Sequence, residues 1–244
     1  MNYYEPLFDR HLIFDSYACR IGKGTHKAVL RAFHFAKSSR YFLKMDVRKY
    51  FDSIDHATLK SLLSALINDN EVLSLFYIII DSNDTVAGKG IPIGNLTSQF
   101  FANHYLSGFD HYFKECCHAK RYTRYMDDIL VFSDDKSELK NIYNNAVWYT
   151  GEKLKLTLKP PISDSVTDGA SFLGFLIKPS GIFLLQKTKK RYKTRMAEIE
   201  YKLKAGQFSE MEAGRRTESV TAHLLLARSL CFRNTVLQGR FLGV

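Results

Sequence analysis

The sequence predicts an α+β fold, in which an antiparallel sheet backed by helices is followed by a helical carboxy-terminal unit. Strand patterns and helical patterns alternate along the chain, and two pairs of strand patterns are spaced as hairpins. Hairpins pair their strands in opposite directions, so the sheet is expected to be antiparallel. From Thr188 onward the apolar residues keep helical spacing only.

The first predicted strand covers residues 41–47, YFLKMDV, and follows a helical pattern that begins at His26. Asp55 is a candidate N-cap, because the apolar residues after it recur at helical spacing. These residues are Leu59, Leu62, Leu63, Leu66 and Ile67. A second apolar segment covers residues 72–80.

A long helix is predicted over residues 96–115, which contain no proline and place their aromatic side chains on one broad face. A hairpin follows, with one strand at residues 121–126 and the other at residues 129–133. Its turn is predicted at Asp127 and Asp128, two adjacent carboxylates whose charges repel each other.

Beyond this hairpin, residues 139–147 repeat the helical spacing, and residues 154–159, LKLTLK, alternate as a strand. Residues 171–177 and 181–185 predict a second hairpin. The helical remainder carries two apolar stripes, formed by Tyr192, Met196, Ile199 and Leu203 and by Val220, Leu224, Ala227 and Cys231. Each stripe predicts a helix that buries one face.

The composition indicates a polyanionic partner. Lys and Arg number 35 against 25 Asp and Glu, which gives a net charge of +10. A protein that neutralises phosphates releases their condensed counterions, which favours binding to nucleic acid. Six cations crowd around Tyr192, namely Lys187, Lys189, Lys190, Arg191, Lys193 and Arg195. We expect this stretch to follow a phosphate backbone; the alternative is the solvated face of a basic helix.

Several other classes of protein are not indicated. No apolar run approaches the ~20 residues that span a bilayer. The amino terminus, MNYYEPLFDR, lacks the basic and apolar regions of a secretory signal. The four cysteines show neither C-x-x-C spacing nor zinc-ligand spacing with histidine. We therefore expect a cytoplasmic protein with no membrane partner and no zinc site.

Three carboxylates are the candidate catalytic groups. Asp46 lies at the end of the first strand, and Asp127 and Asp128 lie at a hairpin turn. These positions can be neighbours in an antiparallel sheet, where the carboxylates would raise one another's pKa values unless a cation neutralised them. Mg²⁺ prefers oxygen ligands, and two such ions form the clamp used for in-line phosphoryl transfer. The alternative is that Asp127 and Asp128 are ordinary turn residues, which aspartate favours.

Three motifs, LKMDVRKYFDSIDH, GIPIGNLTSQFFAN and RYMDDILVFSD, occur in this order and closely resemble the palm motifs of reverse transcriptases. The resemblance implies an RNA-directed DNA polymerase with a right-hand fold of palm, thumb and fingers. It implies that Asp46 and Asp127 hold two Mg²⁺ ions, for which Mn²⁺ can substitute. Asp128 would be an accessory carboxylate and the backbone carbonyl of Val47 a further ligand. The implied substrates are an RNA template, a primer 3′ end and deoxynucleoside triphosphates.

The same resemblance implies a nucleotide site. Phe51 corresponds to the aromatic residue that rejects a ribose 2′-hydroxyl by crowding. The segment IGNLTSQ departs from the family's common Q-G-x-x-x-S-P pattern, with Ile93 in place of Gln before Gly94 and Gln99 in place of Pro. The alternative for Phe51 and for Ile93 is a packing role in the core.

The IGNLTSQ variant resembles the reverse transcriptases of diversity-generating retroelements, as does the segment DSYACRIGKGTHKA. That group is associated with error-prone copying at template adenines. An aliphatic Ile93 cannot make the polar contact that helps to position the nucleotide, so correct and incorrect pairs would be less well separated. The group works with a small basic helical accessory protein, so this partner and a retroelement RNA are implied.

Further motifs extend the resemblance downstream. LKLTLKP resembles the motif whose lysine, here Lys159, lies near the leaving pyrophosphate. FLGF resembles the primer-grip hairpin, here Phe172, Leu173 and Gly174. The basic stretch and the helices after it correspond to the thumb of the family.

The resemblance divides the chain into a residual fingers and palm-entry segment at residues 1–40, a palm at residues 41–182 and a thumb at residues 183–244. The family's two basic finger motifs lie upstream of the DSYACR region, so the fingers are expected to be incomplete. Two alternatives stay open. One is a truncated, catalytically impaired remnant that binds nucleic acid. The other is a reverse transcriptase of the group II intron or retron type, against which the IGNLTSQ variant argues.

Overall fold

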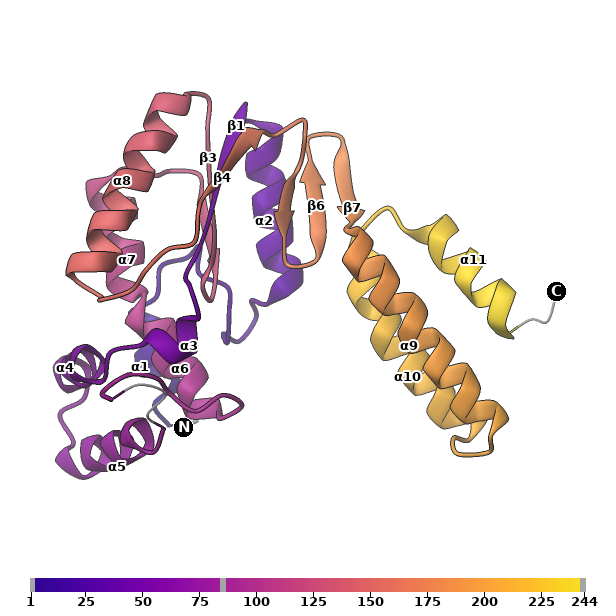
Figure 1. The fold of residues 1–244 in the computed structure, drawn as a ribbon, viewed down its shortest axis with the longest axis horizontal. Helices are drawn as coiled ribbons and strands as arrows, with labels where there is room; N and C mark the ends of the chain where they lie inside the picture. The colour runs from indigo at the N-terminus through magenta and orange to yellow at the C-terminus, as the bar shows by residue number, and fades with distance from the viewer. Residues whose placement is uncertain (1–2, 84–86, 242–244) are drawn as a thin grey trace.

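The computed structural model describes residues 3–83 and 87–241. Its strands are β1 (Tyr41–Asp46), β2 (Tyr122–Tyr125), β3 (Asp128–Ser133), β4 (Ile162–Ser165), β5 (Ala170–Phe172), β6 (Phe175–Lys178) and β7 (Gly181–Leu184). Its α-helices are α1 (Glu5–Arg10), α2 (Thr25–Lys37), α3 (Tyr50–Ser53), α4 (His56–Leu66), α5 (Asn70–Asp81), α6 (Leu96–Tyr105), α7 (Ser107–His111), α8 (Lys136–Glu152), α9 (Gln186–Lys204), α10 (Glu210–Ala222) and α11 (Leu230–Phe241). A π-helical turn, η1 (Tyr112–Cys116), and a 3₁₀ turn, η2 (His223–Leu226), complete the elements. Helices alone follow β7, as predicted (Figure 1).

The larger sheet has the strand order β2-β3-β1-β4, and all of its pairings are antiparallel. β1 and β3 pair along their whole length, from Tyr41 opposite Ser133 to Asp46 opposite Asp128. β4 has the polar sequence ISDS, which gives no strand signal, and it pairs with β1 at the edge of the sheet. The predicted antiparallel sheet is confirmed, with one strand that the sequence pattern does not indicate.

The strands β1 and β3 of the larger sheet bury side chains on both faces. In β1, Leu43 and Met45 belong to a core that α4 to α8 complete, whereas Phe42 belongs to a second core with α2 and the smaller sheet. Figure 1 shows α7 and α8 on one side of this sheet and α2 on the other. A slip of one residue would exchange the two sets of side chains, so the packing specifies the register strongly. Among the described residues, no helix is long and apolar enough to cross a membrane.

β2 and β3 form the predicted hairpin, but the turn lies one residue earlier than predicted. Tyr125 is opposite Asp128, so Met126 and Asp127 form the turn and Asp128 is the first residue of β3. Met126 has a positive φ of 54°, as the first turn residue of tight hairpins commonly requires. Such a backbone conformation is strained in a residue other than glycine.

The single helix predicted over residues 96–115 is wrong, because the segment is divided into α6, α7 and the π-helical turn η1. A π-helical turn adds a residue and so shifts which side chains share a face. Here Phe109 and Phe113 stack with their ring centroids 4.3 Å apart, and Tyr112 stacks on Tyr149 of α8 at 4.9 Å. The apolar pattern of residues 96–115 does not predict their packing against α8, because that helix lies elsewhere in the sequence.

The strand predicted over residues 154–159 is also wrong. Leu158 forms a single antiparallel bridge with Val47, and Lys155 has a positive φ of 52°, which interrupts an extended strand. The backbone amide of Lys159 nevertheless donates a hydrogen bond of 2.8 Å to the carbonyl of Asp46. The segment therefore lies beside the end of β1 without continuing the sheet.

The second predicted hairpin is confirmed in β6 and β7, but the strand predicted over residues 171–177 is interrupted. Leu173 and Gly174 both have positive φ values, of 50° and 90°, and form a two-residue turn between β5 and β6. The chain therefore reverses once more than predicted, and β5, β6 and β7 make a separate three-stranded sheet.

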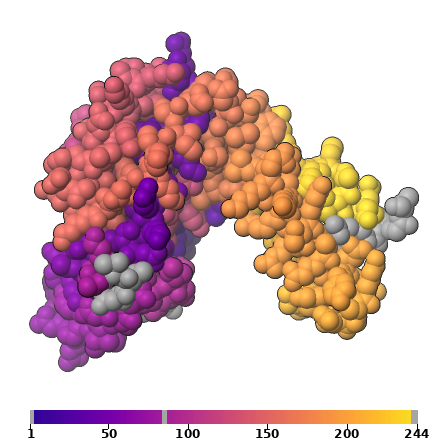
Figure 2. Space-filling model, viewed as in Figure 1, coloured from indigo at the N-terminus to yellow at the C-terminus, as the bar shows by residue number. Residues whose placement is uncertain are grey.

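The carboxy-terminal helices form a separate layer in which α9 contacts both α10 and α11. The first predicted stripe is largely confirmed, because Tyr192, Met196 and Ile199 are buried. The second predicted stripe is not one helix, since α10 ends at Ala222 and the backbone is extended at Ala227. Figure 2 shows these helices projecting from the rest of the molecule across an open space.

Candidate active site

Three carboxylates lie at one end of the larger sheet, and we call Asp46, Asp127 and Asp128 the acidic edge. Asp46 is the last residue of β1 and lies directly opposite Asp128. Side chains of directly opposed residues in antiparallel strands share a face, with Cβ atoms about 4.5–5.5 Å apart. Asp127 precedes Asp128 in the hairpin turn. The fold thus brings the three candidate carboxylates onto one edge.

The charges of the acidic edge oppose one another. Burial raises the pKa of Asp127, and the negative charge of Asp46 raises it further. Burial also raises the pKa of Asp128 to about 6; the ammonium of Lys44 opposes this rise, and the other two carboxylates add to it. Half-buried carboxylates that repel one another favour the binding of a cation.

Two lysines contact the acidic edge. Nζ of Lys159 lies 2.8 Å from Oδ1 of Asp46, and this carboxylate raises the pKa of the lysine. Nζ of Lys44 lies 3.2 Å from Oδ1 of Asp128. Lys159 is a candidate from its motif, whereas the sequence assigns no role to Lys44. The available signal is its place two residues before Asp46, which puts both side chains on one face of β1.

The oxygen atoms of the acidic edge fit a hard divalent cation. Oδ1 of Asp46 and Oδ1 of Asp128 are buried and accept no hydrogen bond of good geometry, despite the nearby ammonium groups. Mg²⁺ is typically held by one or two carboxylates together with substrate phosphates. Within residues 3–83 and 87–241, no three acidic, histidine or cysteine side chains are grouped to hold a metal by themselves. The buried oxygen atoms of Asp46 and Asp128 are therefore the atoms of the acidic edge that fit such a cation.

Val47, the candidate backbone ligand, follows Asp46 and is fully buried. In the bridge between Val47 and Leu158, the amide of Lys159 donates to the carbonyl of Asp46, and the amide of Arg48 donates to the carbonyl of Thr157. Neither of these two bonds uses the carbonyl of Val47.

The turn that carries Asp127 is held by a buried network around Arg124. The guanidinium of Arg124 is fully buried and donates to both carboxylate oxygens of the fully buried Asp110, at 2.7 and 2.5 Å. Its Nη1 donates to Oδ1 of Asn103 and to the backbone carbonyl of Met126, each at 2.9 Å. Burial alone would lower the pKa of Arg124, but Asp110 outweighs it and keeps the guanidinium charged. Sequence reasoning missed this network, whose arginine is the first residue of the motif RYMDDILVFSD.

The network also reaches the amino-terminal segment. Nδ2 of Asn103 donates to the carbonyl of Ala18 at 2.8 Å. The amide of Tyr17 donates to the carbonyl of Arg124 at 3.0 Å, beside the parallel bridge between Ser16 and Arg124. Residues 16–18 therefore lie along the outer side of β2.

The candidate nucleotide residues lie on α3 and α6 and on the loop between α5 and α6. Phe51 is half-buried on α3, and its carbonyl accepts a hydrogen bond from the amide of Ile91 at 3.0 Å. Ile93 is 77% exposed, so the alternative that it packs in the core is wrong. Gly94 follows with a positive φ of 91°. Oε1 of Gln99 accepts a hydrogen bond from Sγ of Cys19 at 3.2 Å.

The candidate primer-grip residues form the turn between β5 and β6. Phe172 is fully buried, whereas Leu173 and Gly174 line an open groove of about 730 Å³ beside α9. The carbonyl of Gly174 accepts hydrogen bonds from the amide of Leu185 at 3.2 Å and from the hydroxyl of Thr188 at 2.7 Å. This turn and the first turn of α9 are therefore held together.

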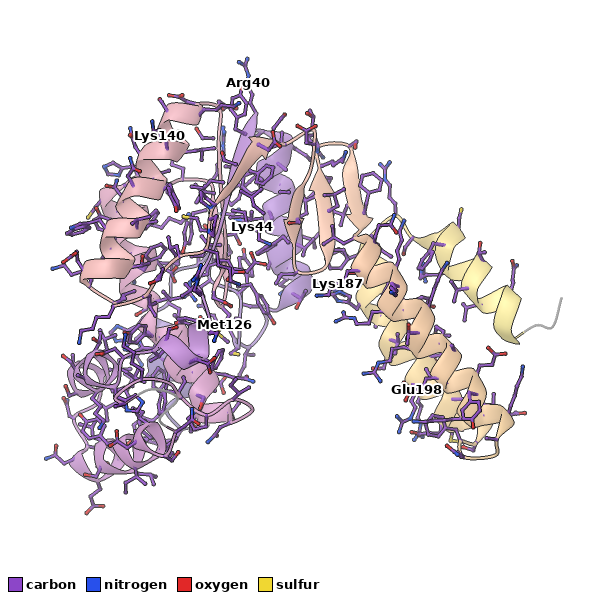
Figure 3. The ribbon with its side chains drawn as sticks, viewed as in Figure 1. Arg40, Lys44, Met126, Lys140, Lys187 and Glu198 are labelled. Carbon is purple, nitrogen blue, oxygen red and sulfur yellow. The ribbon has the colours of Figure 1, made fainter. Side chains whose placement is uncertain are left out.

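The six clustered cations of α9 belong to two different faces, so they do not form one continuous surface. The cations that line the groove are Lys187, Lys190, Arg191 and Arg195. Lys189 and Lys193 instead lie over the ring of Phe232 in α11, with Nζ 5.8 and 5.9 Å from its centroid. Figure 3 labels Lys187 near the start of α9 and Glu198, which also lines the groove, further along the helix.

Comparison with known proteins identifies the family. The model of the family "Reverse transcriptase (RNA-dependent DNA polymerase)" matches residues 4–177. A Schizosaccharomyces pombe protein, "Uncharacterized 91 kDa protein in cob intron", is 30% identical over 115 residues, which are 45% of this chain and 14% of that protein. The "Putative COX1/OXI3 intron 2 protein" of Saccharomyces cerevisiae is 25% identical over 115 residues, 44% of this chain and 14% of that protein. The matched regions are thus a small part of both relatives.

Solved structures share the fold. Apo telomerase from Candida tropicalis has a TM-score of 0.63 at 12% identity and covers 99% of this chain and 49% of its own. Candida albicans telomerase in complex with a fragment of telomeric RNA has a TM-score of 0.56 at 13% identity, over 99% of this chain and 47% of its own. At this identity the likeness concerns the fold alone.

We expect Arg124→Met to destabilise the chain by about 3–5 kcal/mol, because it leaves the carboxylate of Asp110 buried without its partner. Combining it with Asp110→Leu should restore most of that loss, since both charges are then removed. Urea unfolding followed by far-UV circular dichroism measures both effects. The control is Arg121→Met, which breaks an exposed ion pair with Asp134 and should cost less than about 1 kcal/mol. Equal unfolding free energies for Arg124→Met and the parent would contradict this role of the ion pair.

Proposed function

This chain belongs to the reverse transcriptase family, and we propose that it copies RNA into DNA with Asp46, Asp127 and Asp128 as its catalytic carboxylates. Family membership indicates RNA-directed DNA polymerase activity. The observation that carries the residue assignment is the register that sets Asp46 opposite Asp128 beside the turn residue Asp127. The raised pKa values of Asp127 and Asp128 support it, because carboxylates of this kind gain most from a bound cation.

In the proposed reaction, Asp46 and Asp127 would hold two Mg²⁺ ions, with Mn²⁺ as a substitute, assisted by Asp128 and the carbonyl of Val47. When bound, the ions would supply activation of the primer 3′-hydroxyl and neutralisation of the leaving pyrophosphate. Lys159 forms an ion pair with Asp46 in this structure, and its ammonium would contact the triphosphate of the nucleotide instead.

The residues around the acidic edge would set the substrate. Phe51, half-buried on α3, would select deoxynucleotides by crowding a ribose 2′-hydroxyl. Gly94 and Gln99 would border the nucleotide together with Ile93. Phe172, Leu173 and Gly174 would hold the primer 3′ end. These assignments come from the motifs alone, and the side chain of Phe172 is fully buried.

The domain division that we propose has a fingers and palm-entry segment at residues 1–40, a palm at residues 41–182 and a thumb at residues 183–244. The thumb assignment is supported by the groove that α9 shares with the Leu173–Gly174 turn. The groove cations would contact the phosphates of a template–primer duplex. The duplex would then pass from the primer-grip turn along α9.

The finer proposal is a reverse transcriptase of the diversity-generating retroelement type, error-prone at template adenines. It rests on the IGNLTSQ variant and gains support from the 77% exposure of Ile93, which leaves its aliphatic side chain available to a nucleotide. A small basic helical accessory protein and a retroelement RNA would be its partners. An intron-encoded reverse transcriptase is the second candidate, and the two intron-encoded relatives favour it.

We expect Asp127→Asn to lower Mg²⁺-dependent primer extension on an RNA template at least 100-fold, because a catalytic carboxylate is removed. The Kd for the primed template should change less than about twofold. Asp134→Asn is the matched control, since Asp134 is an exposed carboxylate that follows the other end of β3. Incorporation of labelled deoxynucleotides measures extension. A parent chain that binds the duplex without extending the primer would instead favour the catalytically impaired remnant.

We expect Ile93→Gln to lower misincorporation opposite template adenine several-fold, because a polar side chain restores the contact that discriminates between nucleotides. Fidelity opposite the other three bases should change little. Sequencing of extension products measures both, and Ile78→Gln, at another exposed isoleucine on α5, is the control. A parent chain that copies adenine as accurately as the other bases would favour the intron-encoded candidate.

We expect Lys190→Gln with Arg191→Gln to weaken duplex binding about tenfold at physiological salt, because both cations line the groove. The slope of log K against log salt should fall by about 1.8. Lys189→Gln with Lys193→Gln removes the same charge from the face that packs over Phe232 and should change binding less than about twofold. Fluorescence anisotropy measures both pairs, and equal effects would contradict the division of α9 into two faces.

A further inference from the structure

Lys44 contacts the acidic edge from within β1. Lys44 and Asp46 are two residues apart in the strand, so their side chains point to the same face. Asp128 lies opposite Asp46 and is the diagonal neighbour of Lys44, a distance that a long side chain can cross. Nζ of Lys44 lies 3.2 Å from Oδ1 and 3.4 Å from Oδ2 of Asp128. The ammonium is therefore shared between both carboxylate oxygens.

The same ammonium reaches the smaller sheet. Nζ of Lys44 donates a hydrogen bond of 2.8 Å to the backbone carbonyl of Ser171 in β5. Ser171 is opposite Leu176 of β6, at the base of the Leu173–Gly174 turn. One side chain thus joins a carboxylate of the larger sheet to the hairpin of the smaller sheet. Figure 3 labels Lys44 near the centre of the molecule.

The contacts of Lys44 are placed where they can hold the two sheets in one relative position. The side chains of Lys44 and Asp128 are only 17% and 20% exposed, so water screens their interaction weakly. Among the described residues, both sheets also contribute apolar side chains to the second core, such as Phe42 and Phe172. Apolar attraction is non-directional, whereas polar contacts fix the relative position of the atoms that they join. The ammonium of Lys44 makes a hydrogen bond to the smaller sheet and an ion pair with the larger sheet, and these two contacts define the relative position of the sheets.

We propose that Lys44 is a positioning residue that fixes the Leu173–Gly174 turn, and with it the primer 3′ end, relative to the acidic edge. That the primer binds at this turn rests on the proposed function, whereas the link between the two sheets does not. Reacting groups displaced by about 1 Å can lose about 100-fold in rate. A side chain that sets this distance would therefore act on the chemical step more than on binding.

Hydrogen exchange of the chain without nucleic acid tests the link itself. Lys44→Met keeps the length of the side chain and removes the ammonium, and Lys44→Arg keeps a cation that can reach both partners. Lys178→Met is the control, because Lys178 lies at the opposite end of β6 from the Leu173–Gly174 turn. Mass spectrometry should find at least threefold faster exchange over residues 170–177 in Lys44→Met, and rates near those of the parent in the other two variants. Helix α5 serves as an internal reference for intact folding.

Equal exchange over residues 170–177 in Lys44→Met and the parent would overturn the proposal, as would a uniform increase that includes α5. Primer extension then tests the consequence. Lys44→Met should lower kcat at least tenfold, with KM for the nucleotide, Kd for the duplex and half-saturating Mg²⁺ changed less than about twofold. A shift in Mg²⁺ dependence with unchanged kcat would also overturn the positioning role. A parent chain without activity would reject the proposed function, and the exchange result would still decide on the link.

Discussion

The buried ion pair between Arg124 and Asp110 is the constraint on which the acidic edge depends. Two buried charges cost several kcal/mol in lost hydration, which good geometry and further hydrogen bonds must offset. Here one guanidinium joins β2, α6, α7 and the carbonyl of Met126. The hairpin tip therefore cannot move without breaking a bond to a buried charge. This explains how Met126 is held at a positive φ directly before the first carboxylate of the turn.

A second constraint on the acidic edge is the packing of apolar side chains along β1 and β3. β1 and β3 alternate their side chains between two cores, so the pairing that sets Asp46 opposite Asp128 is enforced by apolar packing along both strands. Burial raises the pKa values of Asp127 and Asp128, and repulsion from Asp46 raises them further, so the charges at the end of the sheet act against this pairing. Packing on both faces holds the carboxylates together where their charges alone would separate them.

The sequence predicts those parts of the molecule that depend on local spacing. Asp55 caps α4 as predicted and accepts a hydrogen bond from the amide of Thr58, because a cap and its helix are adjacent in sequence. The hairpin of Asp127 and the strand of Asp46 are found for the same reason. Contacts between distant segments are missed: the partner of Arg124 is on α7, and the two contacts of Lys44 are on β3 and β5. Helical spacing separates Lys189 and Lys193 from the other cations of α9, but only the fold shows that Phe232 of α11 lies against them.

The connection between the smaller sheet and the carboxy-terminal helices has a consequence for how this fold can vary. Leu185 alone separates β7 from α9, and its amide and the hydroxyl of Thr188 are both bound to the carbonyl of Gly174. An inserted residue at this junction would rotate α9 by about 100° about its axis and turn the groove cations away from the hairpin. The junction between β7 and α9 therefore has to keep its length if the groove cations are to face the Leu173–Gly174 turn.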